Sequence, residues 1–233
     1  MGCVETMDNK ELTKLLSSFV MSDGGVYYSG KNCRYIRNQL AKHEDYLTWM
    51  QGILGNVTTC NLVAVNDNRD NRQPSLRLMT RTHPKFTKIR ERFYTGSYKG
   101  VDPHYLKIFD WQCAAILYMD DGGLSTDPRS PNYYTINIYT KRLSYGDTLL
   151  LKKAFKDKLG VEFNIRKERE YYYMTLRRKD AETFIRGVIP HMFPSFEYKL
   201  TYPDGRPLIS TEGDDIVRPP VEAGDIERNH NAL

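Results

Sequence analysis

Two stretches of the chain decide its fold: residues 114–124 read AAILYMDDGGL, and residues 16–26 read LSSFVMSDGGV. They align at an offset of 98 residues, so that Asp23 falls on Asp121 and each acid is followed by two glycines. Tyr98-Lys99 and Tyr198-Lys199 form a second repeated pair, 100 residues apart. Self-similarity at a long interval marks copies of one structural unit. The sequence therefore predicts two similar halves.

Each half is predicted to contain the same order of elements: helix, two strands, helix, two strands, helix. Hydrophobic periodicity and turn signals place them in the first half at residues 9–22, 25–29, 33–40, 43–54, 57–66, 75–82 and 84–94. In the second half they fall at residues 110–121, 123–127, 132–140, 144–159, 161–168, 171–178 and 180–189. We expect an N-terminal domain at residues 1–95, a linker at residues 96–108 and a C-terminal domain at residues 109–202. Residues 203–233 are expected to form a tail.

Alternation along the predicted strands indicates sheets that are covered on one face only. Val161, Phe163 and Ile165 share one face of their strand, and polar residues take the other. A sheet with one apolar face needs helices on that face alone. We therefore expect an α+β protein with two four-stranded antiparallel sheets whose polar faces together form a long saddle. The alternative is that these polar faces are ordinary solvated surfaces.

Charge is distributed unevenly along the chain. The formal net charge is +5, yet residues 201–233 hold seven acids and three bases, which leaves +9 on the first 200 residues. A basic body favours a polyanionic partner, although a merely soluble basic protein has the same property. The Pro-, Gly- and acid-rich end is predicted to be a flexible tail. With 40% hydrophobic residues, the rest of the chain can bury a core.

The remaining sequence signals concern the compartment. Cys3, Cys33, Cys60 and Cys113 are scattered without metal-ligand or paired spacing, which predicts reduced thiols in a bacterial or phage-infected cytoplasm or an organelle matrix. No apolar stretch approaches the roughly 18 residues that span a membrane, and no secretory signal is visible. Residues 1–6 match a minimal myristoylation pattern, which is short enough to be coincidental.

Asp23 and Asp121 are predicted at the C-terminal ends of apolar helices, where the helix dipole disfavours an acid. Glycines after them are expected to provide left-handed turns. Small residues in both helices would let the helices pack closely and bring the two carboxylates together. A divalent ion between them would relieve their repulsion, and oxygen ligands suit Mg²⁺. From the residues alone, Asp120 is predicted to point away from Asp121, because successive helix residues face different directions. The alternative to a metal site is that both helices are ordinary core helices with acidic ends.

The two motifs resemble the signature motifs of LAGLIDADG homing endonucleases of the single-chain, two-motif type. The resemblance covers roughly residues 9–200, and the Tyr-Lys-Leu at residues 198–200 looks most like the I-SceI subgroup. Ser17, Ser18 and Ser22 depart from the small apolar residues usual in the first motif. The resemblance implies a site-specific DNA endonuclease that makes a double-strand break and promotes mobility of its own intron or gene.

The resemblance also implies roles for particular residues. Two or three Mg²⁺ ions, with Mn²⁺ as a substitute, are expected on Asp23 and Asp121, helped by the backbone carbonyls of Ser22 and Asp120. Lys99 and Lys199 are expected to lie beside the scissile phosphates. Gln39 and Lys141 are expected to order water near the metals. The physical roles are consistent, because bound metals activate water and lysines stabilise the negative charge that builds on the phosphate.

DNA recognition is expected on the polar sheet faces, where strands can read base edges in the major groove. The candidates are basic and amide residues of the predicted strands. They are Arg34, Arg37, Asn61, Arg77, Arg81, Asn137, Lys141, Asn164, Arg166, Lys167, Arg177 and Arg178. A single chain need not be symmetric, so a monomer acting on a long non-palindromic target is expected.

Other functions remain open on the same scaffold. One is an RNA-binding maturase that assists intron splicing, and another is a DNA-binding regulator that has lost cleavage. An aspartic protease also pairs two acids, but it needs Asp-Thr-Gly or Asp-Ser-Gly, whereas glycine follows each acid here directly. The five histidines show no metal-ligand spacing, which argues against a histidine-metal nuclease.

Overall fold

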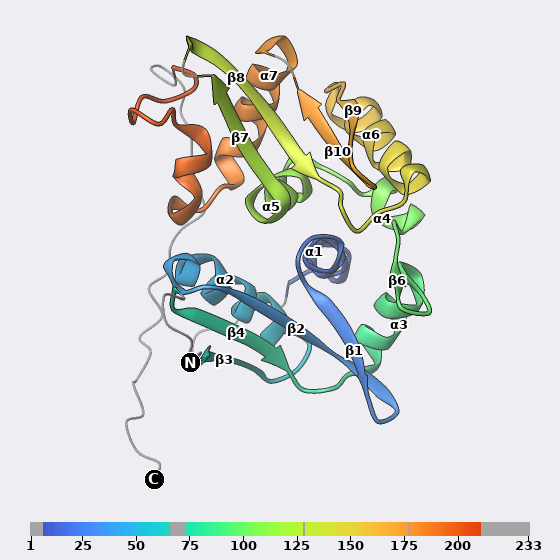
Figure 1. Ribbon diagram of the computed structural model, residues 1–233. Coiled ribbons are helices and arrows are strands. Elements are labelled where there is room, and N and C mark those ends of the chain that lie inside the picture. Colours follow the sequence, from blue (N-terminus) through green and yellow to red (C-terminus); the bar gives the residue numbers. More distant parts are fainter. Residues whose placement is uncertain (1–6, 66–72, 128, 177, 211–233) are drawn as a thin grey trace.

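A computed structural model describes residues 7–65, 73–127, 129–176 and 178–210 of the 233-residue chain. Two halves of similar architecture are stacked on each other, and one helix of each half lies at their junction (Figure 1). The predicted α+β class and the two four-stranded antiparallel sheets are confirmed. None of the helices in the described residues has the length and apolar composition of a membrane span.

The first half has one antiparallel sheet of order β1-β2-β4-β3. Its elements are α1 (Asn9–Met21), β1 (Gly25–Ser29), β2 (Asn32–Leu40), the 3-10 turn η1 (Ala41–His43), α2 (Glu44–Gly55), β3 (Cys60–Val65), β4 (Ser75–Thr80) and α3 (Pro84–Phe93). Cys33, Tyr35 and Leu78 point into the core, where they meet Leu47 and Phe86 from the covering helices. Because side chains alternate along a strand, the opposite face of this sheet is left uncovered.

The second half repeats this topology, with sheet order β7-β8-β10-β9. Its elements are α5 (Trp111–Asp121), β7 (Gly122–Asp127), β8 (Ser130–Tyr139), α6 (Tyr145–Leu159), β9 (Asn164–Glu168), β10 (Tyr171–Leu176), α7 (Arg178–Val188) and the 3-10 turns η2 (Ile189–His191) and η3 (Pro194–Leu200). Ile136, Ile138 and Met174 form its apolar sheet face. The predicted strand over 161–168 begins only at Asn164, since Val161 and Phe163 are buried before the ladder starts.

The segment between the halves is itself structured. It holds a short hairpin of β5 (Tyr94–Thr95) and β6 (Tyr98–Lys99), followed by the helix α4 (Pro103–Lys107). Asp102 starts α4 by accepting a hydrogen bond from the backbone N–H of His104 at 2.9 Å. The hairpin matters for the site, because it carries Lys99 towards the end of α1.

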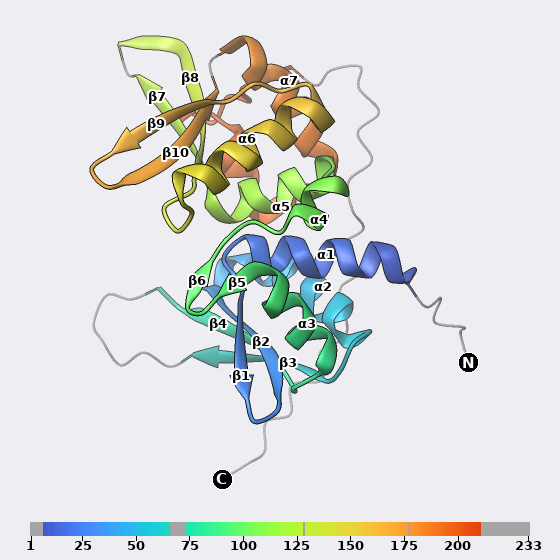
Figure 2. The ribbon, with the colours of Figure 1, turned by 90° about the vertical axis from the view of Figure 1, so that its right-hand side faces the viewer.

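Helices α1 and α5 lie side by side between the two sheets (Figure 2). Their facing sides carry small residues, and Ser17, Ser18, Ala114 and Ala115 are all buried. Short side chains allow two helix axes to approach closely. At the N-terminal end of α5, Lys14 of α1 donates a hydrogen bond to Asp110 at 2.7 Å. The far ends of the two helices therefore meet as well, and these are the ends that lead to Asp23 and Asp121.

The glycines after the two acids serve close packing, not the left-handed turns that the sequence suggested. Gly24, Gly25, Gly122 and Gly123 have no positive φ, unlike Gly160 at the end of α6. A Cβ on Gly24 would lie 2.2 Å from the Phe19 carbonyl oxygen, and one on Gly122 would lie 2.0 Å from Tyr118 Cδ2. Glycine is required because the backbone passes directly over the preceding helical turn.

The second half extends further than predicted. Thr201 forms a bridge with Pro207, and the Leu208 N–H donates to the Leu200 carbonyl at 2.9 Å. Leu208 and Ile209 are buried. Residues 203–210 are therefore part of the folded half and not of a flexible tail, whereas the rest of the predicted tail and the myristoylation pattern lie outside the described residues.

Candidate active site between the two halves

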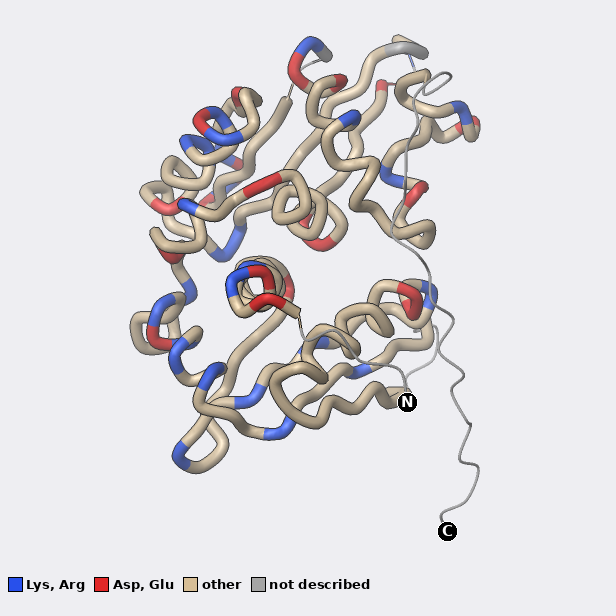
Figure 3. Tube along the Cα trace, turned by 180° about the vertical axis from the view of Figure 1, so that it is seen from behind, with Lys and Arg blue, Asp and Glu red and all other residues tan. Residues whose placement is uncertain are grey.

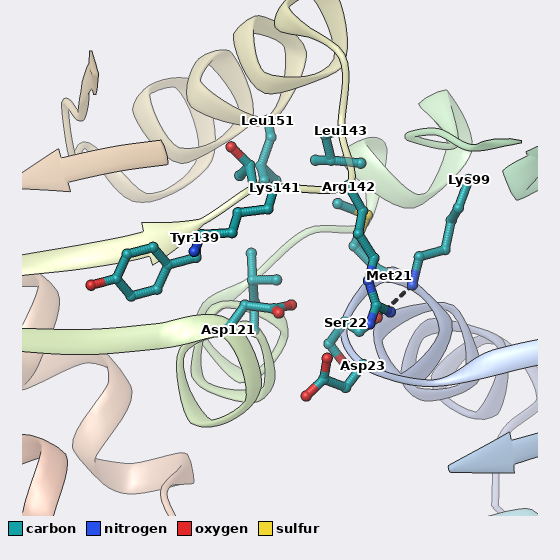
Figure 4. A pocket seen from close by; sticks show the side chains of 12 residues that line it. Met21, Ser22, Asp23, Lys99, Asp121, Tyr139, Lys141, Arg142, Leu143 and Leu151 are labelled. Atoms are coloured by element: carbon teal, nitrogen blue, oxygen red, sulfur yellow. Dashed lines mark hydrogen bonds between the residues drawn. The ribbon is translucent and has the colours of Figure 1, made fainter. Parts of the chain in front are cut away.

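Asp23 and Asp121 line the same pocket of about 200 Å³. Asp121 is the last residue of α5, and Asp23 follows α1 by two residues. Both carboxylates extend into the space between the two helix ends (Figure 4). The close packing of α1 against α5 thus brings together two acids that are 98 residues apart in the sequence.

The electrostatics of the pocket fit a cation. Burial, followed by the negative charges of Asp23 and Asp120, raises the pKa of Asp121 to about 7. Positive charge brought close to such an acid favours its ionised form. The two carboxylates therefore form a place where a divalent ion would be favourable.

A buried lysine caps the helix end in each half. Lys99 donates from Nζ to the carbonyl oxygens of Val20 at 2.9 Å, Ser22 at 2.6 Å and Gly24 at 3.3 Å. An ammonium group has three N–H donors, so all of them are used. Burial lowers the pKa of Lys99 to about 8, while the charge of Asp121 opposes that shift.

Lys199 does the same for α5. Its Nζ donates to the carbonyl oxygens of Tyr118 at 3.1 Å, Met119 at 2.7 Å and Gly122 at 2.7 Å. Burial lowers its pKa to about 8, and Asp120 provides the largest opposing charge. The predicted lysine pair is therefore matched in space, although Lys99 comes from a β-hairpin and Lys199 from a 3-10 turn.

The available donors suit Mg²⁺ better than a softer metal. Within the described residues, no group of three His, Cys, Asp or Glu side chains is placed to hold an ion. The two pocket carboxylates, backbone carbonyls and water are the oxygen ligands that Mg²⁺ prefers. The Asp120 side chain is fully buried while the residue as a whole is only half-buried, so its accessible part is backbone. The Ser22 carbonyl is already engaged by Lys99.

The predicted water-ordering pair is only half matched. Lys141 lines the pocket, whereas Gln39 is half-buried on β2 and does not. The register pairs Gly25 with Ile36 and the equivalent Gly123 with Asn137. Gln39 lies three residues after Ile36, and Thr140 lies three residues after Asn137, so Thr140 is the structural counterpart of Gln39. The predicted pairing of Gln39 with Lys141 is therefore shifted by one residue.

Arg142 is a pocket residue that the sequence analysis missed. It belongs to the loop between β8 and α6, and its side chain reaches down towards Ser22 and Asp23 (Figure 4). Its positive charge contributes to the lowered pKa of Lys99. The only signal in the sequence was its position next to Lys141, in a loop whose path could not be foreseen.

The uncovered face of the first sheet is rich in arginine. Arg34, Asn61 and Arg81 line a shallow hollow of about 250 Å³. Arg77 is exposed and donates to Asn38 Oδ1 at 2.9 Å, on the opposing strand. Four of the five predicted contacts in this half therefore share one face, and Asn38 joins them. By contrast, acidic and basic residues are interspersed on the helix side of the molecule (Figure 3).

Arg37 is the exception, and its prediction as a DNA contact is wrong for this structure. It follows Cys33 and Tyr35 at a spacing of two residues and so points with them to the covered face. Its side chain is 0% exposed and pairs with Asp120 of the other half. The alternation was visible in the sequence, but the charge of the residue was given more weight than its position.

The second sheet presents tyrosine and amide groups on its uncovered face. Asn164 and Arg166 are exposed there, beside Tyr139, Tyr171 and Tyr173, which the sequence analysis overlooked. Lys141 lines the pocket, and the other predicted contacts of this half are buried, turned away or not described. Asn137 is 5% exposed and donates to Ser125 Oγ at 2.9 Å, Lys167 lies on the opposite face over the Tyr172 ring, Arg177 lies outside the described residues, and the Arg178 side chain is not described.

Two repeated units with paired acids at adjoining helix ends define the class of protein. The model of the LAGLIDADG DNA endonuclease family matches residues 15–184, and the chain belongs to that family. The resemblance read from the two motifs is thereby confirmed, while its assignment to the I-SceI subgroup stays a prediction.

The chain is also similar to individual curated proteins. The chain is 26% identical over 193 residues to a Protein RecA of Mycolicibacterium flavescens, covering 78% of this chain and 44% of that protein. It is 21% identical over 201 residues to the cytochrome b mRNA maturase bI2 of Debaryomyces hansenii, covering 82% of this chain and 74% of that protein. The chain thus spans less than half the length of the RecA relative.

A solved structure has the same fold. The homing endonuclease I-WcaI, bound to its DNA recognition sequence, superposes with a TM-score of 0.71 at 18% identity, covering 83% of this chain and 87% of that one. At this identity the similarity establishes the fold, and it leaves the chemistry to be argued from the residues of this chain.

Proposed function

We propose that this protein is a divalent-metal-dependent DNA endonuclease that cuts both strands of a long, non-palindromic target. The observation that carries the proposal is that two equivalent acids, Asp23 and Asp121, line one pocket at the junction of the halves. A buried lysine stands behind each of the two helix ends. Site, charge and family all favour the same reaction.

Residues of both halves would share the work. Asp23 and Asp121 would hold the divalent ions, which supply an activated water and neutralise charge on both the attacking and leaving oxygens. Lys99 and Lys199 keep positive charge fixed near the phosphates while negative charge develops there. Arg142 adds a third cationic group that can move, since it is exposed and has a long flexible side chain.

The duplex would lie along the uncovered faces of the two sheets. Arginines of the first sheet suit phosphates and guanine edges, and Asn164 and the tyrosines of the second suit adenine edges and apolar contacts. The faces differ in residue content, so an asymmetric target is favoured. Mobility of the host intron or gene would follow from cleavage at an unoccupied copy of that target.

Cleavage selection from random DNA tests the proposal and identifies the target in the same experiment. A plasmid library of random inserts is incubated with the protein and Mg²⁺, and linearised molecules are recovered and sequenced. Asp23→Asn and Asp121→Asn should each bind the selected duplex with nearly unchanged affinity in gel-shift assays and yield no linear product. Full activity in either variant would rule out the two-acid mechanism.

Intron splicing is a second candidate, favoured by the similarity to the Debaryomyces maturase along most of both chains. A maturase would bind its intron RNA without using the pocket acids. Splicing of the host intron that persists in Asp23→Asn would establish this role beside cleavage. Failure of the protein to bind or splice that RNA would eliminate it.

A further inference from the structure

One buried ion pair joins the two halves directly beside the candidate active site. Arg37 of β2 donates from Nη1 to Asp120 Oδ2 at 2.7 Å and from Nη2 to Asp120 Oδ1. Both side chains are 0% exposed. The Tyr46 hydroxyl lies 3.5 Å from Asp120 Oδ2, and the guanidinium stands over the Tyr46 ring at 5.2 Å. The Asp120 carboxylate is thus held on two sides.

When the two halves are exchanged, the positions that correspond to Arg37 and Asp120 carry no charge. Asp120 corresponds to Ser22 by the motif alignment. The strand registers make Arg37 correspond to Ile138, since each lies one residue beyond the partner of an equivalent glycine. Ile138 is 0% and Ser22 is 2% exposed. The protein therefore has a charged pair behind Asp121 and an apolar residue with a hydroxyl behind Asp23.

Stability alone is a poor explanation for this difference. Taking two charges out of water costs about as much as their attraction returns, and apolar residues often replace such pairs without loss. The other half demonstrates this, because Ile138 and Ser22 fill the same positions in a buried setting. The pair needs a reason connected with what stands next to it in the chain.

That neighbour is Asp121. Successive helix residues point about 100° apart, so the direction of the Asp120 side chain fixes the direction of the next one. Two adjacent carboxylates at an open helix end would also compete for the same cation. A bidentate guanidinium removes one of them from that competition and sets its orientation.

We propose that Arg37 is a positioning residue for Asp121: by clamping the Asp120 carboxylate outside the pocket, it holds the last turn of α5 so that only Asp121 faces the cation. This inference rests on the proposed function, because it concerns the same site. Asp23 needs no such clamp, since Ser22 precedes it and offers no second carboxylate. Arg37 acts through Asp120 and does not itself line the pocket.

Terbium(III) binding, followed by tyrosine-sensitised luminescence, measures the pocket without requiring cleavage. Asp23→Asn combined with Asp121→Asn identifies the signal that belongs to the pocket. Arg37→Met should weaken that binding by about 10- to 100-fold, as loss of partners that orient metal ligands commonly does. The double variant Arg37→Ile with Asp120→Ser, which copies the pair of the other half, should recover most of the affinity because the competing carboxylate is gone.

Lys14→Met is the matched control. Lys14 of α1 also forms an ion pair between the halves, at 2.7 Å from Asp110 at the start of α5, and lies far from the helix ends that carry Asp23 and Asp121. It should lower thermal stability and leave terbium binding unchanged. If Arg37→Met binds terbium as the unsubstituted protein does, or loses no more than Lys14→Met, the positioning role is overturned while the proposed nuclease stands. If the unsubstituted protein shows no pocket-dependent signal, the metal site itself is overturned, and both proposals fail with it.

Discussion

The two halves share one topology but use it differently. The uncovered face of the first sheet carries Arg34, Arg77 and Arg81, whereas that of the second carries Tyr139, Tyr171 and Tyr173 together with Arg166. The lysine behind the first helix end comes from a hairpin, and that behind the second comes from a 3-10 turn. The difference teaches that the central pocket constrains positions in space, while the surrounding elements are free to diverge.

The largest expected effect tests whether the two lysines are equivalent despite their different supports. Lys99→Met and Lys199→Met should each reduce double-strand cleavage by about 10²- to 10³-fold, the usual result of removing one group that stabilises developing charge. Each variant should accumulate nicked circles from a supercoiled plasmid that carries the selected target, with opposite strands cut.

An exposed lysine in the linker helix supplies the control. Lys107→Met should cleave like the unsubstituted protein, because Lys107 lies on the surface of α4. Undiminished linear product from either Lys99→Met or Lys199→Met would show that the matched carbonyl contacts only cap the helices. Loss in one variant alone would show that the halves are unequal in chemistry as well as in recognition.

The sequence was sufficient for the parts of the molecule that repeat. Two copies of one motif, each with its periodic helix and strands, predicted the α+β halves and the neighbourhood of Asp23 and Asp121. Strand alternation also predicted which faces are uncovered. These properties are local, because periods of about 3.6 and 2 residues are readable in any single element.

What could not be predicted depends on contacts between the halves or on loop paths. Arg37 was assigned to DNA although it lies two residues after Tyr35 and therefore on the same covered face. Its partner, Asp120, belongs to the other half and gave no local signal. Arg142 enters the pocket through a loop whose direction no period encodes. Leu208 and Ile209 were left in the tail because their acidic surroundings outweighed two apolar residues.

A smaller effect is expected at the glycines that follow the two acids. Gly24→Ala would place a Cβ 2.2 Å from the Phe19 carbonyl oxygen, and Gly122→Ala would place one 2.3 Å from the Tyr118 carbonyl oxygen. Each should lower the free energy of unfolding by about 1–3 kcal/mol, as overpacking does. Urea denaturation followed by circular dichroism measures both losses.

Gly52 in α2 is the matched control for these variants. A Cβ there meets nothing within 4 Å, so Gly52→Ala should stabilise the protein by about 0.5–1 kcal/mol through reduced chain entropy. Similar losses at Gly24 and Gly122 would mean that the two helix ends are equally tight. Tolerance of alanine at either position would show that the backbone there can move away from the preceding turn.

The smallest effect concerns recognition, and it separates the two sheet faces by their dependence on salt. Each phosphate contact made by a cation contributes about 0.9 to the slope of log affinity against log salt concentration. Arg81→Gln should therefore reduce that slope by about this amount, whereas Tyr173→Leu should weaken binding equally at all salt concentrations, because a tyrosine displaces no counterions. Fluorescence anisotropy with the selected duplex, without divalent ions, measures both slopes. Equal slopes in the two variants would mean that the arginine face and the tyrosine face bind DNA by the same forces, and the contrast between the halves would then be one of composition only.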